Sequence, residues 1–90
     1  MPLVRCTPHL QRFFPGLGEE RVPGTTAAAA IAALDARYPG LARYVLDDQG
    51  ALRPHVNVFI GKEPVRDRKG LSDPVAENAE LTIMQALSGG

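Results

Sequence analysis

The 90-residue sequence has one cysteine, no excess of charge of either sign and no long apolar run. A single cysteine cannot form a disulfide within the chain, so nothing indicates an oxidising compartment. Ten basic residues balance ten acidic ones, whereas nucleic-acid-binding proteins usually carry a basic excess. No apolar run approaches the length of a membrane span, and Met1–Cys6 lack the apolar stretch of a signal peptide. We therefore expect a cytoplasmic protein with no nucleic-acid or membrane partner.

Residue patterns typical of metal, nucleotide or catalytic sites are also missing. The two histidines, His9 and His55, have no second ligand at a metal-like spacing. Cys6 belongs to no two-cysteine motif, and its place on the apolar face of a strand predicts a core residue. Gly16–Gly18 lacks the rest of a nucleotide-binding fingerprint. We expect no metal site, no bound cofactor and no independent enzyme activity.

An alanine-rich segment predicts one main helix over Ala27–Tyr38, because alanine costs least of all residues in a helix. Thr25–Thr26 can cap its first turn, and Pro39–Gly40 ends it. Apolar residues recur at helical spacing, which predicts one face packed on a sheet. These residues are Ala27, Ala30, Ile31, Leu34 and Tyr38. One more helical turn is expected around Leu41–Val45, followed by a turn at Asp47–Gly50.

Alternation of apolar and polar residues predicts the strands, two of which are short. The predicted strands are at 3–10, 19–22, 56–60, 63–65 and 81–84. Gly61–Lys62 can close a tight hairpin, and Pro64 removes a hydrogen-bond donor, so the strand after this turn is expected at a sheet edge. One helix lying across one mixed sheet, an α+β fold, would bury these faces in a single domain.

Two exposed features are candidates for partner binding. If the apolar residues of the last strand face the core, Met84 faces outward, and Phe59 likewise opposes the apolar face of its own strand. Together they would form an apolar patch of the kind that marks protein partners. The alternative is that one or both are core residues of a two-sided sheet. Arg66, Arg68 and Lys69 could form a basic rim, or simply a solvated loop.

The chain ends in Gly89–Gly90, directly after the apolar run Leu81–Ser88. Two glycines carry no side chain, so such a tail can lie extended in a narrow slot and offer only its terminal carboxylate. A frayed terminus is the simple alternative. The pattern favours Gly90 as the reactive residue, at the end of a flexible tail.

The second half of the chain resembles the ubiquitin-like sulfur carriers of the MoaD/ThiS family. This family includes the small subunit of molybdopterin synthase, the thiamine-pathway carrier and a carrier serving cysteine synthesis. The matching segments are Val56–Glu63, Arg66, Gly70–Leu71, Asp73–Val75, Glu80–Ile83 and Gly89–Gly90. From Leu3 to Tyr38 the likeness rests on the order of strands and helix. The stretch from Gly40 to Pro54 resembles the longer members, including the cysteine-pathway type.

The resemblance implies a β-grasp (ubiquitin-like) fold, with one mixed sheet of four or five strands and one main helix across it. It also implies that a ubiquitin-activating-type enzyme uses ATP to adenylate Gly90. Sulfur from a sulfur source then replaces the adenylate, and the resulting thiocarboxylate serves a sulfur-accepting synthase or catalytic subunit in molybdopterin, thiamine or cysteine biosynthesis. Gly89 would let the tail thread the enzyme's active site without a side-chain clash, and Leu87 would help to dock it.

Two residues of the tail depart from the family pattern. Many family tails carry proline where this chain has Gln85 and alanine where it has Ser88. Gln85 frees a backbone N–H and would make the tail less rigid. Two other functions stay open: a protein modifier that joins Gly90 to lysines of target proteins, and a β-grasp interaction subunit whose tail is inert.

Overall fold

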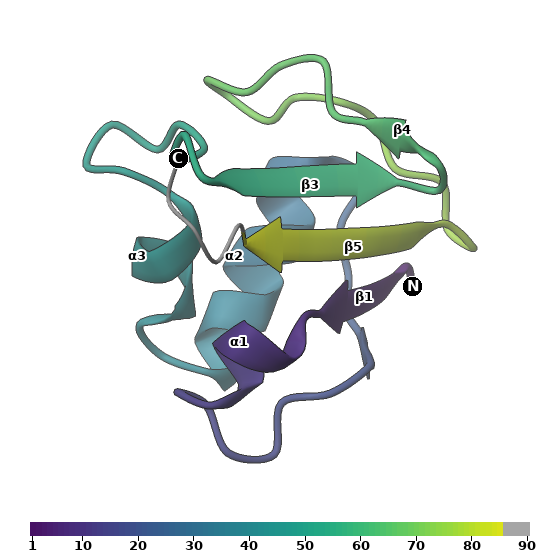
Figure 1. The fold of residues 1–90 in the computed structure, drawn as a ribbon. Helices are drawn as coiled ribbons and strands as arrows, with labels where there is room; N and C mark the ends of the chain where they lie inside the picture. The colour runs from purple at the N-terminus through teal and green to yellow at the C-terminus, as the bar shows by residue number, and fades with distance from the viewer. Residues whose placement is uncertain (86–90) are drawn as a thin grey trace.

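A computed structural model describes residues 1–85 of the chain (Figure 1). Within these residues, five strands form one sheet and three helices complete the fold. The strands are β1 (Leu3–Cys6), β2 (Glu20–Arg21), β3 (Val56–Ile60), β4 (Glu63–Pro64) and β5 (Glu80–Gln85). The helices are α1 (Pro8–Gln11), α2 (Ala27–Arg37) and α3 (Leu41–Val45). Helix α2 packs across one face of the sheet, whereas α1 and α3 lie near the end of β5 (Figure 1).

The sheet is mixed, with strand order β2-β1-β5-β3-β4. The central strand β5 runs parallel to β1, with Val4 opposite Leu81. It runs antiparallel to β3, with Val58 opposite Ile83. The short strand β4 pairs only with the end of β3, at the edge that the proline predicts. The strand order, the mixed pairing and the helix across one face confirm the predicted β-grasp fold.

Helix α2 turns two alanines, Ala27 and Ala30, and two larger residues, Ile31 and Leu34, into the core. Thr26 caps the helix as predicted, and its hydroxyl accepts a hydrogen bond of 3.1 Å from the Ala29 amide. Ala27 and Ala30 are fully buried, which brings neighbouring backbone close to the helix. At Gly24 a Cβ atom would lie 2.7 Å from the Ala30 amide nitrogen, and the φ angle of +149° also disfavours a side chain.

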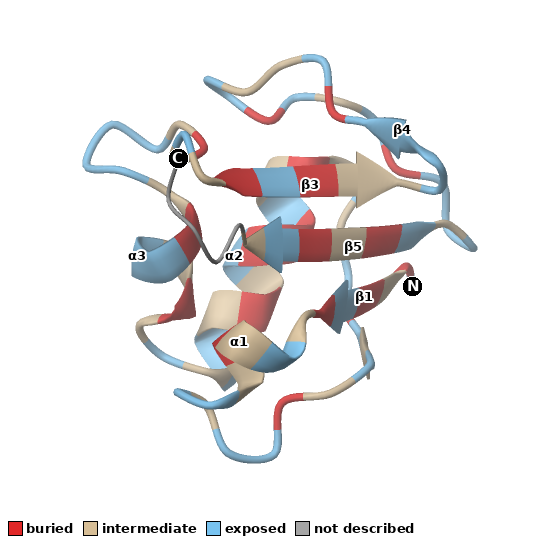
Figure 2. Ribbon diagram, viewed as in Figure 1, coloured by how far each residue is buried: buried red, intermediate tan, exposed pale blue. Residues whose placement is uncertain are grey.

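The core lies between α2 and one face of the sheet. Buried and exposed residues alternate along β3 and β5, as Figure 2 shows. Val58, Leu81 and Ile83 are fully buried, as their alternation predicts. Cys6 is also buried in this core, and burial raises the pKa of its thiol to about 12. The thiol therefore stays protonated near neutral pH, which fits the predicted core role rather than a nucleophile.

The predicted first strand, Leu3–Leu10, is wrong in its second half. Strand β1 ends at Cys6, and Pro8 begins the short helix α1, where a proline at the first helical position loses no hydrogen bond. Pro8, which continues the alternation of Val4 and Cys6 in the sequence, is exposed, whereas Leu10 is buried from the helix instead. The extra turn at Leu41–Val45 is confirmed as α3.

Candidate functional site

The end of β5 is the point where the described chain leads toward the glycines that we predict to react. Gln85 is its last residue and pairs with Val56 of β3. The Gln85 side-chain amide donates a hydrogen bond of 3.2 Å to the carbonyl oxygen of Tyr44 in α3. This bond ties the end of the central strand to α3, which the sequence did not indicate. The predicted tail residues Leu87, Gly89 and Gly90 lie outside the described residues.

Phe59 and Met84 lie on the face of the sheet opposite α2. The register places Phe59 opposite Thr82 and Met84 opposite Asn57, so the two side chains are diagonal neighbours on one face. Met84 is 42% exposed, and Phe59 is half-buried. The structure thus favours the outward patch over two core residues. Partner binding by this pair stays a prediction.

The charged loop after β4 is more than a solvated loop. The guanidinium of Arg68 donates hydrogen bonds to the carbonyl oxygens of Val56 (2.7 Å) and Arg53 (3.0 Å) and to Oδ1 of Asn57 (3.1 Å). These bonds hold the loop against the start of β3, beside the end of β5. Arg66 is exposed and Arg68 is half-buried, so of the two arginines only Arg66 has the exposure expected of a basic rim. Partner binding by either arginine stays a prediction.

Two carboxylates stabilise the same loop by accepting hydrogen bonds from its backbone amides. Asp67 accepts hydrogen bonds from the amides of Lys69, Gly70 and Ser72 and from the Ser72 hydroxyl. These bonds, that from the Gly70 amide most of all, lower the pKa of Asp67 from 3.8 to about 2. Asp73 accepts hydrogen bonds from the amides of Arg66 (2.9 Å) and Asp67 (2.8 Å). These two bonds, that from Arg66 most of all, lower the pKa of Asp73 as well. Both groups are therefore structural acceptors, not proton donors.

An aromatic cluster beside the end of β5 was not predicted from the sequence. Phe13 stacks on Tyr44 with ring centroids 5.1 Å apart, and His9 meets the edge of Phe13 at 5.8 Å. Phe14 packs edge-on against Tyr44 from the inner side. The two phenylalanines adjoin a Pro-Gly turn, and this was the only sequence signal. Residues far apart in the chain thus form one exposed aromatic surface.

This cluster borders a hollow of about 380 Å³, which we call the aromatic hollow. Its lining combines four rings, from two histidines, a phenylalanine and a tyrosine, with two arginines and the glutamine that ends β5. The residues are His9, Phe13 and Tyr44, with Arg43, Arg53 and His55, and Gln85 at the strand end. The hollow therefore adjoins the last described residue before the predicted reactive tail.

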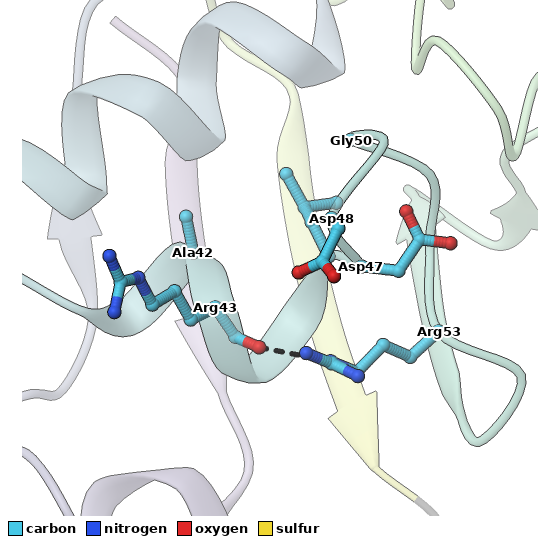
Figure 3. Close-up of a pocket in the computed structure, with 7 residues that line it drawn as sticks. Ala42, Arg43, Asp47, Asp48, Gly50 and Arg53 are labelled. Atoms are coloured by element: carbon cyan, nitrogen blue, oxygen red, sulfur yellow. Dashed lines mark hydrogen bonds between the residues drawn. The ribbon is translucent and has the colours of Figure 1, made fainter.

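A second hollow of about 590 Å³ lies beside α3 and the turn that follows it (Figure 3). Arg43 and Arg53 border both hollows, and the Nε atom of Arg53 donates a hydrogen bond of 2.9 Å to the Arg43 carbonyl. Asp47 closes the predicted turn, because its carboxylate accepts bonds from the amides of Gln49 and Ala51. This hollow is thus bordered by side chains that stabilise a turn.

Within residues 1–85, no group of three or more histidine, cysteine or acidic side chains could hold a metal ion. None of the helices in this part of the chain has the length and apolar character needed to cross a membrane.

Comparison with known proteins gives consistent matches. The model of the ThiS family matches residues 12–90. The sulfur carrier protein CysO of Mycobacterium tuberculosis is 35% identical over 69 residues, which is 74% of each chain. A chain of the Amycolatopsis orientalis BexX/CysO complex superposes with a TM-score of 0.87 at 26% identity, over 100% of both chains. SAMP1 from Haloferax volcanii gives 0.82 at 27% identity, over 99% of this chain and 98% of the other.

The family match extends over most of the chain and includes the segments that suggested the resemblance. The structural matches cover the chain almost completely and share its β-grasp architecture. This protein therefore belongs to the ThiS family of ubiquitin-like proteins.

Proposed function

We propose that this protein is a sulfur carrier that holds sulfur as a thiocarboxylate on Gly90 and delivers it in a cysteine-type biosynthetic pathway. The observation that carries the proposal is the 35% identity to the sulfur carrier CysO, together with a family match that reaches Gly90. The central position of β5 supports it, because a reactive tail that follows this strand starts from a fixed point.

Two chemical steps would load the carrier. A carboxylate is a poor electrophile because it lacks a good leaving group. In the first step an oxygen of the Gly90 carboxylate attacks the α-phosphorus of ATP, and pyrophosphate leaves. In the second step a sulfide-level nucleophile attacks the acyl carbon, the C–S bond forms, and AMP leaves with the bonding electrons. Splitting a difficult transfer into two easier steps is the principle of covalent catalysis.

The partner enzymes supply the catalytic groups, and this chain supplies the substrate carboxylate. A ubiquitin-activating-type enzyme binds ATP and the sulfur source, and a sulfur-accepting enzyme receives the sulfur. The chain itself binds no cofactor in this scheme and acts as a protein cosubstrate in the cytoplasm. Gly89 and Leu87 position the tail in both enzymes, and the Phe59 and Met84 pair on the outer face of the sheet contacts a partner.

A protein modifier is the second candidate, and one observation favours it. SAMP1 from Haloferax volcanii, a small archaeal modifier protein, shares the fold at 27% identity. The same adenylate would then react with a lysine amine, and an isopeptide bond would form in place of the C–S bond. The acceptor decides between the two outcomes, since the activating step is the same.

Intact-mass measurement tests the proposal. The protein is incubated with ATP, sulfide and the activating enzyme from its own host, and a variant lacking Gly90 serves as the control. A mass gain of one oxygen-to-sulfur exchange on the last residue is expected for the full chain only. A ladder of isopeptide conjugates in host cells, without the thiocarboxylate, would support the modifier. An unchanged mass with an enzyme that is active on another carrier would indicate an inert tail.

A further inference from the structure

The aromatic hollow is a second surface beside the end of β5, distinct from the Phe59 and Met84 patch on the open face of the sheet. Phe13 is 50% exposed and Tyr44 is 41% exposed, although both rings are large and apolar. Their stacking at 5.1 Å holds the two exposed rings in one arrangement. Preformed aromatic surfaces of this kind are enriched in protein interfaces, because they offer large contact area at low entropy cost.

The charge of the hollow is one-sided, although the whole chain is neutral. Arg43 and Arg53 line it together with two histidines, and no carboxylate of the described residues does. Asp47 and Asp48 line the neighbouring hollow, which Arg43 and Arg53 also border, and Figure 3 shows the Arg43 side chain extending away from both carboxylates. Neither arginine forms a salt bridge within residues 1–85. The cationic groups therefore remain available to an acidic partner.

The hollow also lies where an enzyme that acts on the C-terminus must approach. Gln85 lines it and is the last residue of β5. Gly90 is only the fifth residue after Gln85. Five extended residues reach at most about 17 Å, so an enzyme whose active site holds Gly90 covers surface close to Gln85.

We propose that the aromatic hollow is the docking surface for the adenylating enzyme, which meets it with an acidic surface that bears an apolar side chain packed against Phe13 and Tyr44. This inference rests on the proposed sulfur-carrier function. The adenylating enzyme is the occupant because it must select an unmodified chain, whose carboxylate resembles that of any other protein. A sulfur-accepting enzyme can instead recognise the thiocarboxylate itself. Selection by the first enzyme therefore needs the folded surface beside the tail.

Steady-state kinetics of adenylation test the charge of this surface. The assay follows ATP–pyrophosphate exchange by the purified adenylating enzyme of the same host, with the full chain as the varied substrate. Arg43→Glu reverses one exposed charge whose side chain makes no hydrogen bond within residues 1–85. Lys62→Glu makes the same charge change in the exposed β3–β4 hairpin and serves as the matched control. Arg43→Glu is expected to raise KM about tenfold at low salt with kcat unchanged, and Lys62→Glu to leave both unchanged.

The aromatic part of the surface needs a second pair of variants. Phe13→Ala is expected to raise KM about tenfold with kcat unchanged, as for an aromatic anchor of an interface. Phe13→Tyr keeps the stacked ring and is expected to restore most of the KM. Thermal unfolding of each variant separates a docking effect from a loss of folded protein.

Three outcomes would overturn the inference. Wild-type exchange with an unchanged KM for Arg43→Glu and Phe13→Ala would refute the docking surface and leave the carrier function intact. Normal adenylation of these variants combined with slow sulfur delivery would assign the surface to the sulfur-accepting enzyme instead. No exchange with the wild-type chain would refute the proposed function, and this inference with it.

Discussion

Replacing Arg68 by alanine is expected to destabilise the fold far more than the same change at Arg66, two residues away. The Arg68 guanidinium donates three hydrogen bonds, to the carbonyl oxygens of Val56 and Arg53 and to the Asn57 side chain. Arg66 is exposed, and its side chain forms no hydrogen bond or salt bridge in the described part of the chain. The two substitutions remove the same charge from the same loop, so their difference isolates the three bonds.

The magnitude follows from the number of bonds. A hydrogen bond within a protein contributes about 0.5–1.5 kcal/mol net, so the loss of three is expected to lower the free energy of unfolding by about 1.5–4.5 kcal/mol. In a domain of this size each kcal/mol corresponds to a shift in Tm of about 4–8 °C. Arg66→Ala, as a surface substitution, is expected to change the free energy by no more than about 0.5 kcal/mol.

Urea unfolding monitored by circular dichroism, with thermal unfolding beside it, measures both variants. Arg68→Lys adds a test of geometry, because a single ammonium group keeps the charge but cannot reach three separate acceptors. Most of the stability loss should therefore persist in Arg68→Lys. The reasoning would be refuted if Arg68→Ala were as stable as Arg66→Ala, or if lysine restored full stability. An increase in the adenylation KM for Arg66→Ala alone would support its predicted role at a partner surface.

Three further predictions concern the core and the loop. Gly24→Ala is expected to lower the free energy of unfolding by about 1–3 kcal/mol, because Gly24 has a positive φ and the new Cβ atom would clash with the backbone of Ala30. The control Gly18→Ala places its Cβ atom in open space and should leave thermal unfolding unchanged. Because burial raises the Cys6 pKa to about 12, a thiol reagent at about pH 8 should label the native protein slowly and the urea-unfolded protein fast, and fast native labelling would contradict the buried site. Asp67 has a folded-state pKa lowered from 3.8 to about 2, so its ionised form stabilises the fold above about pH 4, and this contribution is lost as the pH falls toward 2. In Asp67→Asn the free energy of unfolding, measured by urea titration, should therefore fall less steeply between about pH 4 and about pH 2 than in the wild type. An unchanged pH dependence would refute the role of this carboxylate.

The elements predicted best from the sequence are those whose pattern is regular over a full element. Helix α2 and strands β3 and β5 carry apolar residues at periods of 3.6 and 2, and the structure places them as expected. Helix α1 was missed because Val4, Cys6, Pro8 and Leu10 continue the alternation of a strand by coincidence. Four residues are too few to show helical spacing, and only the proline marked the start of the helix.

The candidate site was predicted in part, for a different reason. Gly90 is suggested by chemistry that the last residues carry in themselves, whatever surrounds them. The aromatic hollow depends on contacts between Phe13 and Tyr44, which are separated by a turn, a strand and a helix. The three bonds of Arg68 likewise join a loop to residues of β3 and the turn before it. No local sequence pattern predicts contacts between residues so far apart in the chain, so only the tertiary structure shows them.

The central place of β5 has a consequence for how the chain folds. Strands β1 and β3 do not pair with each other, and only β5, which lies between them, joins the two halves of the sheet. The two outer pairs, β1 with β2 and β3 with β4, therefore stay separate until residues 80–85 have left the ribosome and found their place. Closing such long loops is slow compared with forming a helix. A growing chain accordingly exposes unpaired strand edges until β5 is made, and we expect chaperone contact to be concentrated in that interval.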